Sequence, residues 1–238
     1  MSSRRSFAPL GSPNGDPTDN RLQLKGIVFD MDGTLCEPQN YMFGQMREAL
    51  NITKQTDILD HIHALPEPEQ SEAFAKVQQI ESDAMVKQTP QAGLVTLMEF
   101  LDRCGVRKAI CTRNFDAPVN HLLTNHIPNH LTPFSPVVTR GFRPPKPSPA
   151  GILHIAQAWG IVDSADVPDT PPSERPLPLL MVGDSEDDVA AGRDAGAVTV
   201  FLTSPGKEDL ETDPRTDVVI KRLDELVGLL EKGLEARV

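Results

Sequence analysis

Short apolar segments alternate along the chain with longer segments whose apolar residues recur every three or four positions. The short segments are rich in Val, Ile, Leu and Phe, and runs of this kind are typical of buried strands. They predict strands at 27–29, 106–111, 136–139, 179–182, 198–202 and 218–220. Helical spacing of apolar residues predicts helices at 94–101, 119–123, 150–159 and 223–230, with one more after Asp184. Strands that alternate with helices indicate an open α/β sheet.

One long segment interrupts this alternation. Residues 36–89 have apolar positions at helical spacing, among them Met42, Met46 and Ile62, and they predict a small insert of three or four helices. Residues 1–20 are rich in Ser, Pro, Gly and Asn and predict a disordered tail. The expected organisation is therefore a tail at 1–20, a core from 21–35 and 90–238, and a helical insert at 36–89.

Composition and charge exclude some classes of function but do not identify the activity. The 238 residues carry a formal net charge of -11, which argues against a nucleic-acid partner because no basic surplus exists to displace phosphate counterions. The chain has no run of 18 apolar residues, so we expect no membrane span. Cys36, Cys104 and Cys111 form no C-x-x-C pair and are expected to be reduced thiols of a cytoplasmic protein. The oligomeric state stays open.

Two carboxylates directly follow the first strand. Asp30 and Asp32 lie two positions apart, where ligands of open α/β sheets usually bind, and Gly33 can turn the chain so that backbone N–H groups face an anion. Carboxylates held this close repel each other unless a cation is bound or one is protonated. The alternative is an Asp-Gly turn with no chemistry.

Two further segments carry groups suited to phosphate. Thr112 and Asn114 follow the strand at 106–111, where a hydroxyl and an amide can donate to phosphate oxygens, although Asn114 can equally cap a helix. Lys146 is flanked by prolines, which limit the freedom of its loop and suit presentation of an ammonium to an anionic site. A polyproline recognition segment is the alternative for this loop.

A second pair of acids follows the strand at 179–182. Asp184 and Asp188 are four apart at the start of a helix and can lie on one face of it. Carboxylate oxygens suit Mg²⁺. Helix capping is the alternative, and Ser185 or Asp187 can cap while Asp184 binds metal.

These motifs stand in the order of the four motifs of a known superfamily. Asp30-x-Asp32-Gly33-Thr34, Thr112, Lys146 and Gly183-Asp184-x-x-x-Asp188 resemble those of the haloacid dehalogenase-like hydrolases, and the resemblance covers Leu24 to Leu230. It implies a doubly wound, Rossmann-like parallel sheet, with the insert at 36–89 as a small type 1 helical cap of a subfamily I phosphatase.

The resemblance also implies an activity. The chain is expected to be a Mg²⁺-dependent phosphomonoester hydrolase that acts on a small phosphorylated metabolite through an aspartyl-phosphate intermediate. Asp30 is implied as the nucleophile and Asp32 as the general acid and base. The residues implied in phosphate binding are Thr112, Asn114 and Lys146, and those implied at the metal are Asp30, Asp32 through its carbonyl, Asp184 and Asp188.

The sequence leaves three alternatives to this activity to consider. Dehalogenases of the superfamily lack the second aspartate of the first motif, so Asp32 argues against carbon–halogen cleavage. A sugar phosphomutase uses the same pair of carboxylates and stays open. A catalytically silent protein that binds a phosphorylated ligand is the third alternative, and the retained acids and Lys146 argue against it.

Overall fold

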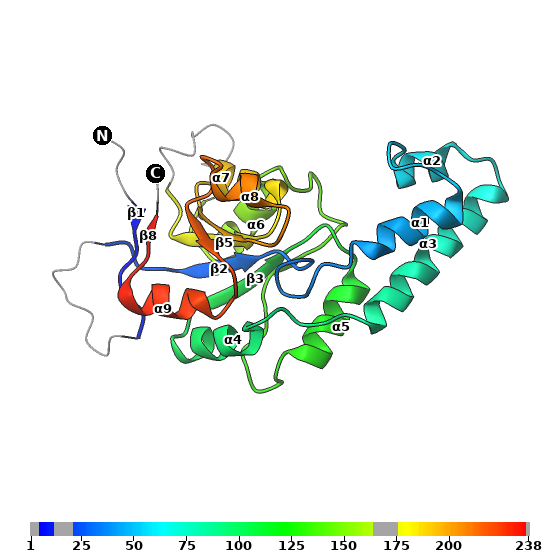
Figure 1. Ribbon diagram of the computed structural model, residues 1–238. Helices are drawn as coiled ribbons and strands as arrows, with labels where there is room; N and C mark the ends of the chain where they lie inside the picture. Colours follow the sequence, from blue (N-terminus) through cyan, green and yellow to red (C-terminus); the bar gives the residue numbers. More distant parts are fainter. Residues whose placement is uncertain (1–4, 12–20, 164–175, 237–238) are drawn as a thin grey trace. The chain divides into compact units, whose positions relative to one another are not determined.

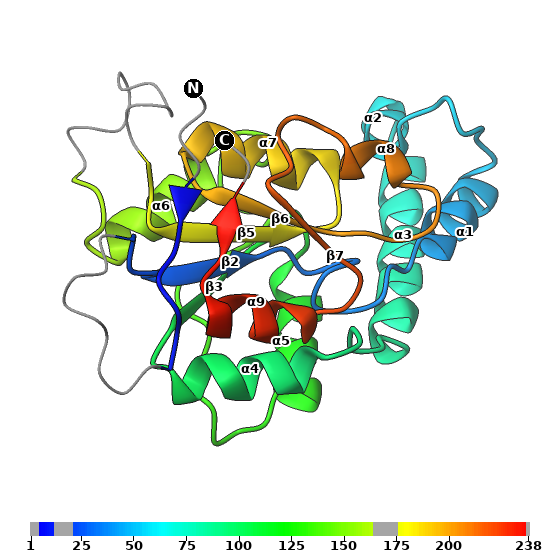
Figure 2. The ribbon, with the colours of Figure 1, turned by 60° about the vertical axis from the view of Figure 1, so that its left-hand side comes forward.

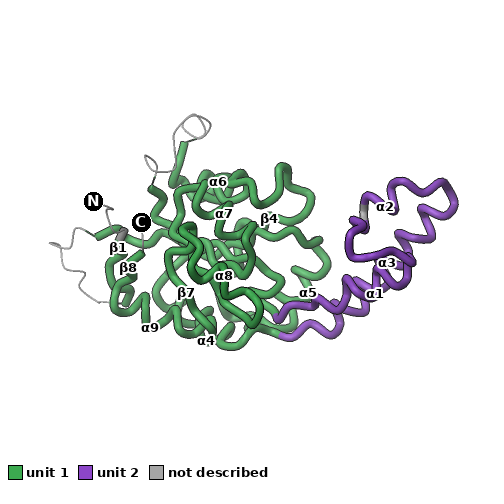
Figure 3. Tube along the Cα trace, turned by 45° about the horizontal axis from the view of Figure 1, so that its top comes forward, with its two compact units in different colours: residues 1–36, 90–238 green, residues 37–89 purple. Residues whose placement is uncertain are grey.

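The computed structural model describes residues 5–11, 21–163 and 176–236. The chain divides into two compact units, one formed by residues 1–36 together with 90–238 and the other by Glu37–Thr89 (Figure 3). Cys36 belongs to the first unit, where it forms isolated bridges to Asp32 and Pro90. The helical unit therefore begins one residue later than the expected insert.

The larger unit is built on six parallel strands in the order β4-β3-β2-β5-β6-β7 (Figure 1). The strands are β2 Gly26–Phe29, β3 Arg107–Cys111, β4 Val137–Val138, β5 Leu179–Gly183, β6 Val198–Leu202 and β7 Val218–Ile220. Chain order reverses between β2 and β5, and ligands of such sheets bind outside the carboxyl ends of the strands. The predicted doubly wound α/β fold is confirmed.

Helices cover both faces of this sheet (Figure 2). One face carries α4 Leu94–Arg103, α5 Asp116–His126 and α9 Glu225–Lys232. The other face carries α6 Ala150–Ala158 and α7 Glu186–Ala195. The four-residue helix α8 Glu208–Glu211 follows β6.

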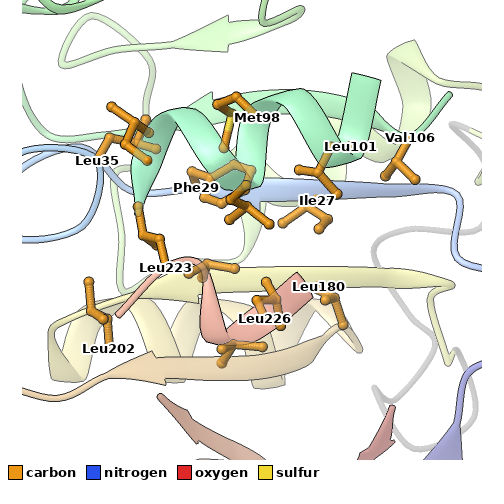
Figure 4. Close-up of a cluster of buried hydrophobic side chains, with 14 of the residues drawn as sticks. Ile27, Phe29, Leu35, Met98, Leu101, Val106, Leu180, Leu202, Leu223 and Leu226 are labelled. Atoms are coloured by element: carbon orange, nitrogen blue, oxygen red, sulfur yellow. The ribbon is translucent and has the colours of Figure 1, made fainter. Parts of the chain in front are cut away.

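The central strand shows why the sheet is buried on both sides. Ile27 and Phe29 pack into the cluster that contains Met98 and Leu226 (Figure 4). Val28 packs into the cluster on the opposite face. Successive side chains of a strand point to opposite faces, so an unbroken apolar run suits a strand covered by two layers. Burial of each such side chain contributes about 1.5–3 kcal/mol. This packing fixes where the strand ends and hence where Asp30 lies.

The helical unit contains α1 Tyr41–Leu50, α2 Ile58–Ala64 and α3 Glu69–Val86. Its apolar residues meet in one small cluster around Ile62, which is fully buried. Three helices in Glu37–Thr89 agree with the expected three or four. Among the described helices of the whole chain, none is both long and apolar enough to cross a membrane.

The prediction of a disordered tail at 1–20 is wrong for residues 5–11. Strand β1 Arg5–Ser6 pairs antiparallel with β8 Glu235–Ala236, and the Phe7 side chain is fully buried in the main core. The polar composition of the segment gave no indication of a strand. The strand β1 forms because its partner β8 lies at the other end of the chain. Residues 1–4, 12–20 and 164–175 lie outside the described residues.

Candidate active site

Three neighbouring strands bring the predicted residues to one edge of the sheet. Strand β2 lies between β3 and β5, and Phe29 is in register with Ile110 on one side and Val182 on the other. Asp30 follows β2 and its backbone N–H donates to Val182 O at 2.9 Å. Thr112 and Asp184 directly follow β3 and β5. Parallel strands end at the same edge, so the residues that follow these three strands lie together there.

Lys146 joins two of the predicted acids. Its Nζ donates to Asp30 Oδ1 at 2.6 Å and also to Asp188 Oδ1, and its side chain is only 3% exposed. Burial alone would lower the pKa of Lys146, but the Asp188 and Asp30 carboxylates outweigh it and hold that pKa above its usual range. The lysine therefore stays charged at the centre of the site.

Asp30 carries a negative charge that its surroundings do not fully balance. Burial raises the pKa of Asp30 to about 7, because the ion pair with Lys146 only partly offsets the loss of hydration and the repulsion from Asp188. Lys146 is shared between the two carboxylates, so it neutralises one of them. Near neutral pH, Asp30 requires either a proton or an additional cation.

Asp188 is held from several directions. Its Oδ2 accepts hydrogen bonds from Ser185 N at 3.0 Å, Ser185 Oγ at 2.5 Å and Asp184 N at 3.2 Å. Ser185 is the N-cap of α7, so the carboxylate also closes a capping box at the start of this helix. The predicted capping is found in this segment, with Ser185 at the N-cap and Asp188 completing the capping box, while the other oxygen of Asp188 accepts from Lys146. Metal binding by Asp188 stays a prediction.

Asp184 has a partner that sequence reasoning missed. Lys207 Nζ donates to the Asp184 carbonyl oxygen at 2.7 Å and to its carboxylate Oδ2. Burial raises the pKa of Asp184, and the hydrogen bond from Lys207 acts in the opposite direction. Lys207 comes from the loop after β6, which ends at the same edge of the sheet. Lys207 follows a predicted strand of the parallel sheet, so its approach to this edge could have been expected. Its contact with Asp184 could not, because the spacing between the two residues matches no motif.

Asp32 and Asn114 form a second pair at this edge. Asn114 Nδ2 donates to Asp32 Oδ2 at 2.6 Å, and Cys36 Sγ lies 3.6 Å from Asp32 Oδ1. Solvent reaches Asp32, yet the protein atoms around it remove enough hydration to raise its pKa, against the hydrogen bond from Asn114. The N-cap of α5 is Phe115, so Asn114 orients the Asp32 carboxylate and does not occupy the N-cap position.

Thr112 lies beside this pair and is 5% exposed. Its Oγ1 accepts a hydrogen bond from Asn114 N at 3.1 Å, and its backbone N–H donates to Val138 O at 2.9 Å. The direct role of Thr112 and Asn114 in phosphate binding stays a prediction.

The structure fits a divalent cation among the acids. Asp30, Asp184 and Asp188 each offer an oxygen, and within the described part of the chain these atoms lie within 4.8 Å of one another. A Cβ at Gly33, whose φ is +80°, would lie 2.1 Å from Asp184 Oδ2, so only glycine lets the Asp30–Gly33 segment approach this carboxylate. The ammonium of Lys207 on Asp184 shows that this oxygen set already attracts a cation. The Asp32 side chain is not part of the cluster, and its predicted carbonyl contact stays a prediction.

Comparison with known proteins agrees with this geometry. Residues 24–196 match the family model described as haloacid dehalogenase-like hydrolase. A Saccharomyces cerevisiae protein named as an uncharacterized hydrolase is 43% identical over 212 residues, which cover 87% of this chain and 91% of that protein.

Two solved structures share the fold at low sequence identity. CbbY from Rhodobacter sphaeroides in complex with xylulose-1,5-bisphosphate has a TM-score of 0.63 at 18% identity, covering 86% of this chain and 96% of that one. A β-phosphoglucomutase from Clostridium difficile has a TM-score of 0.64 at 13% identity, covering 86% and 93%.

Proposed function

The chain belongs to the haloacid dehalogenase-like hydrolase family, and we propose that it is a Mg²⁺-dependent phosphomonoester hydrolase acting on a small phosphorylated metabolite. One observation carries the proposal. A buried lysine bridges Asp30 and Asp188, while Asp184 presents a further carboxylate oxygen from the neighbouring strand. A nucleophile, a fixed cation and a place for a metal thus meet at the edge of the sheet where α/β folds bind ligands.

In the first half of the reaction, an Asp30 oxygen attacks the phosphorus of the ester in line with the bond that breaks. The phosphorus–oxygen bond to the substrate breaks, and the leaving alkoxide takes a proton from Asp32. The raised pKa of Asp32 suits a carboxyl that must carry this proton. Lys146 holds Asp30 and balances charge on the transferring phosphoryl oxygens.

In the second half, Asp32 takes a proton from water and the oxygen of that water attacks the phosphorus of the aspartyl phosphate. Inorganic phosphate leaves, Asp30 is regenerated as a carboxylate, and Asp32 is protonated again. Asn114 keeps the Asp32 carboxylate in one orientation through both halves. Each proton that Asp32 gives to the alkoxide is thus replaced by one from water.

The metal would be held by the Asp30 carboxylate, the Asp32 carbonyl and the Asp184 carboxylate. When bound, Mg²⁺ supplies positive charge that offsets the repulsion between a carboxylate nucleophile and a phosphate. Both oxygens of Asp188 are already engaged by Lys146, Ser185 and the backbone. We therefore assign Asp188 to the positioning of Lys146 and not to direct coordination. Cys36, Cys104 and Cys111 form no disulfide, which fits the cytoplasmic setting that we propose.

The test is phosphate release from a panel of phosphorylated metabolites, with Mg²⁺ and with EDTA. We expect the wild type to release phosphate only with Mg²⁺ and Asp30→Asn to release none. Asp194→Asn is the matched control, because it changes the same kind of group at an exposed position of α7 and should keep wild-type activity.

The other outcomes identify the alternatives. Interconversion of phosphosugars that needs a bisphosphate primer and yields no net phosphate would replace the hydrolase with a phosphomutase. Binding of Mg²⁺ and phosphate without turnover of any ester would replace it with a phospholigand-binding protein. Near wild-type activity in Asp30→Asn would remove Asp30 as the nucleophile.

A further inference from the structure

The Asp30 loop, residues 30–36, is bonded from outside by one glutamine. Gln91 follows the helical unit Glu37–Thr89 in the chain and belongs to the larger unit. Its side-chain Nε2 donates to Gly33 O at 3.1 Å, and its backbone N–H donates to Leu35 O at 3.0 Å. Two carbonyl oxygens of the loop therefore accept from a residue in a distant part of the sequence.

The side-chain amide of Gln91 has one orientation that satisfies both of its ends. Its Oε1 accepts from Ala92 N at 3.2 Å while its Nε2 donates to Gly33 O. If the amide were turned by 180°, two acceptors would meet at Gly33 O and two donors at Ala92 N, so both bonds would be lost. The amide therefore presents a donor to the loop.

The loop itself offers little to hold the Gly33 carbonyl. Gly33 is buried, and no other donor to its oxygen is found among the described residues. The backbone N–H groups of Thr34, Leu35 and Cys36 all donate to Met31 O, at 3.2, 2.8 and 3.1 Å. The Thr34 hydroxyl is buried with no partner in the described part of the chain. The Gly33 peptide group therefore depends on the glutamine for its hydrogen bond.

Gly33 lies at a point where rotation would alter the site. Its φ of +80° is in the left-handed region, which glycine enters and leaves more easily than other residues. The peptide groups on its two sides carry the Asp32 carbonyl, a proposed ligand of Mg²⁺, and the Gly33 carbonyl, which Gln91 holds. A Cβ on Gly33 would lie 2.1 Å from Oδ2 of Asp184, the neighbouring proposed ligand. A rotation at Gly33 would therefore turn the Asp32 carbonyl beside this carboxylate.

We propose that Gln91 is a positioning residue of the candidate active site, whose side-chain amide fixes Gly33 and thereby keeps the Asp32 carbonyl in one orientation for Mg²⁺. This inference rests on the proposed function, because it assigns a role to that carbonyl at the metal. Gln91 does not touch the reacting atoms in this role. It holds the loop in one conformation before the metal binds, which reduces the conformational entropy lost on binding.

The first test is calorimetric titration of the metal-free protein with Mg²⁺. Gln91→Met keeps an unbranched side chain of similar length but has no donor for Gly33 O. We expect it to bind Mg²⁺ about three- to tenfold more weakly than the wild type, the range of one hydrogen bond between neutral groups. Gln79→Met is the matched control, because it removes an amide that donates to Asp83 on α3 and should leave the affinity unchanged.

A second control separates positioning from stability. Val106 is buried in the main core next to the first residue of β3, at the end of the strand away from the site. Val106→Ala should destabilise the larger unit and keep the Mg²⁺ affinity of the wild type at temperatures where the protein is folded. Equal weakening of Mg²⁺ binding in Val106→Ala and Gln91→Met would overturn the proposal, because lost stability would then explain both.

Hydrogen exchange in EDTA gives a readout without metal. The amides of Thr34, Leu35 and Cys36 should exchange about severalfold faster in Gln91→Met, because the loop loses a contact from outside. The amides of β6 should exchange as in the wild type. Unchanged exchange in the loop would overturn the proposal even if Mg²⁺ bound more weakly.

Turnover separates this role from the proposed function. With an ester that the wild type hydrolyses, Gln91→Met should raise the Mg²⁺ concentration for half-maximal rate and keep the KM for the ester at saturating Mg²⁺ within about twofold. A rise in that KM alone would overturn the proposal. If Mg²⁺ binds but no ester is hydrolysed, the hydrolase proposal fails and the affinities still decide the role of Gln91. If the wild type binds no Mg²⁺, the metal site and this role are refuted together.

Discussion

The two units of this chain differ in how much apolar material holds them together. In the larger unit, layers on both faces of the sheet bury strand residues such as Ile27, Val28 and Ile110 completely. In the helical unit, five buried residues form the whole core cluster among the residues described there. Tyr41 and Val86 of that unit are 46% and 72% exposed. Every candidate catalytic residue belongs to the larger unit.

The difference explains why the closely spaced catalytic carboxylates lie in the larger unit. Carboxylates that repel each other stay close only if the backbone beneath them does not yield, and buried parallel strands provide that backbone. A unit with few buried contacts opens more easily and tolerates change. We therefore expect the geometry of the acids to depend on the sheet, and less on the stability of the helical unit.

We expect the largest effect on turnover and stability when a buried cation is removed from the larger unit. Lys146→Met should lower turnover by about a hundredfold or more, because Asp30 loses its fixed partner and the phosphoryl oxygens lose a donor. It should also lower the free energy of unfolding by about 3–5 kcal/mol, since buried carboxylates lose their counter-ion. Steady-state kinetics and urea unfolding measure the two effects.

Lys108→Met is the matched control for that variant. Lys108 is a buried lysine of β3 whose Nζ donates to Thr132 Oγ1 at 2.9 Å and to Asp102 at 3.5 Å, away from the proposed chemistry. It should destabilise the fold and keep turnover below its unfolding temperature. Equal turnover in both variants would remove Lys146 from the reaction.

A cavity in each unit tests whether their stabilities are separate. Ile62→Ala, in the core of the helical unit, should cost about 2–5 kcal/mol, and so should Ile110→Ala in β3. Hydrogen exchange should show faster opening of Glu37–Thr89 alone in the first variant and of the sheet in the second. Loss of protection across both units in Ile62→Ala would contradict the comparison.

The stability of the larger unit should depend on pH through the titration of Asp30. Its native pKa of about 7 lies above its ordinary value of 3.8, so the native state binds more protons than the unfolded state between these values. The free energy of unfolding of the metal-free protein should therefore fall as pH rises from about 4 to about 7. The raised pKa values of Asp32 and Asp184 act in the same direction.

Urea unfolding in EDTA at several pH values measures this slope. Asp30→Asn should flatten it, because the amide does not titrate in this range. A wild type that gains stability from pH 4 to pH 7, or a variant with an unchanged slope, would show that the burial of Asp30 does not control this dependence.

The smallest expected effect concerns Lys207, at the rim of the acid cluster. Lys207→Met should bind Mg²⁺ about severalfold more tightly, because no ammonium then competes for the Asp184 carboxylate. The side chain of Lys207 is 29% exposed, so solvent screening keeps the change modest. Calorimetric titration with Mg²⁺ measures it. Lys76→Met, at an exposed position of the helical unit, removes the same charge and should leave Mg²⁺ affinity unchanged.

Much of the fold could be predicted because its signals are local. The apolar runs that end at Phe29, Cys111 and Gly183 are strands, and the polar residues after them meet because parallel neighbours end together. The segment at 5–11 was misjudged for the opposite reason. Arg5 and Ser6 pair with the far end of the chain, and the backbone N–H of Phe7 donates to Leu234 O, so the local sequence alone does not indicate a strand there.

The amino-acid sequence specifies which chemical groups follow each strand, and therefore that Asp30, Thr112 and Asp184 share one edge of a parallel sheet. The partners of those groups depend on how the chain folds in three dimensions. Lys146 reaches Asp30 across 116 positions, Asn114 reaches Asp32 across 82, and Lys207 reaches Asp184 from a loop without a motif. The positions of the strands along the chain follow from the short-range apolar pattern, whereas the path of a loop depends on packing summed over the whole molecule.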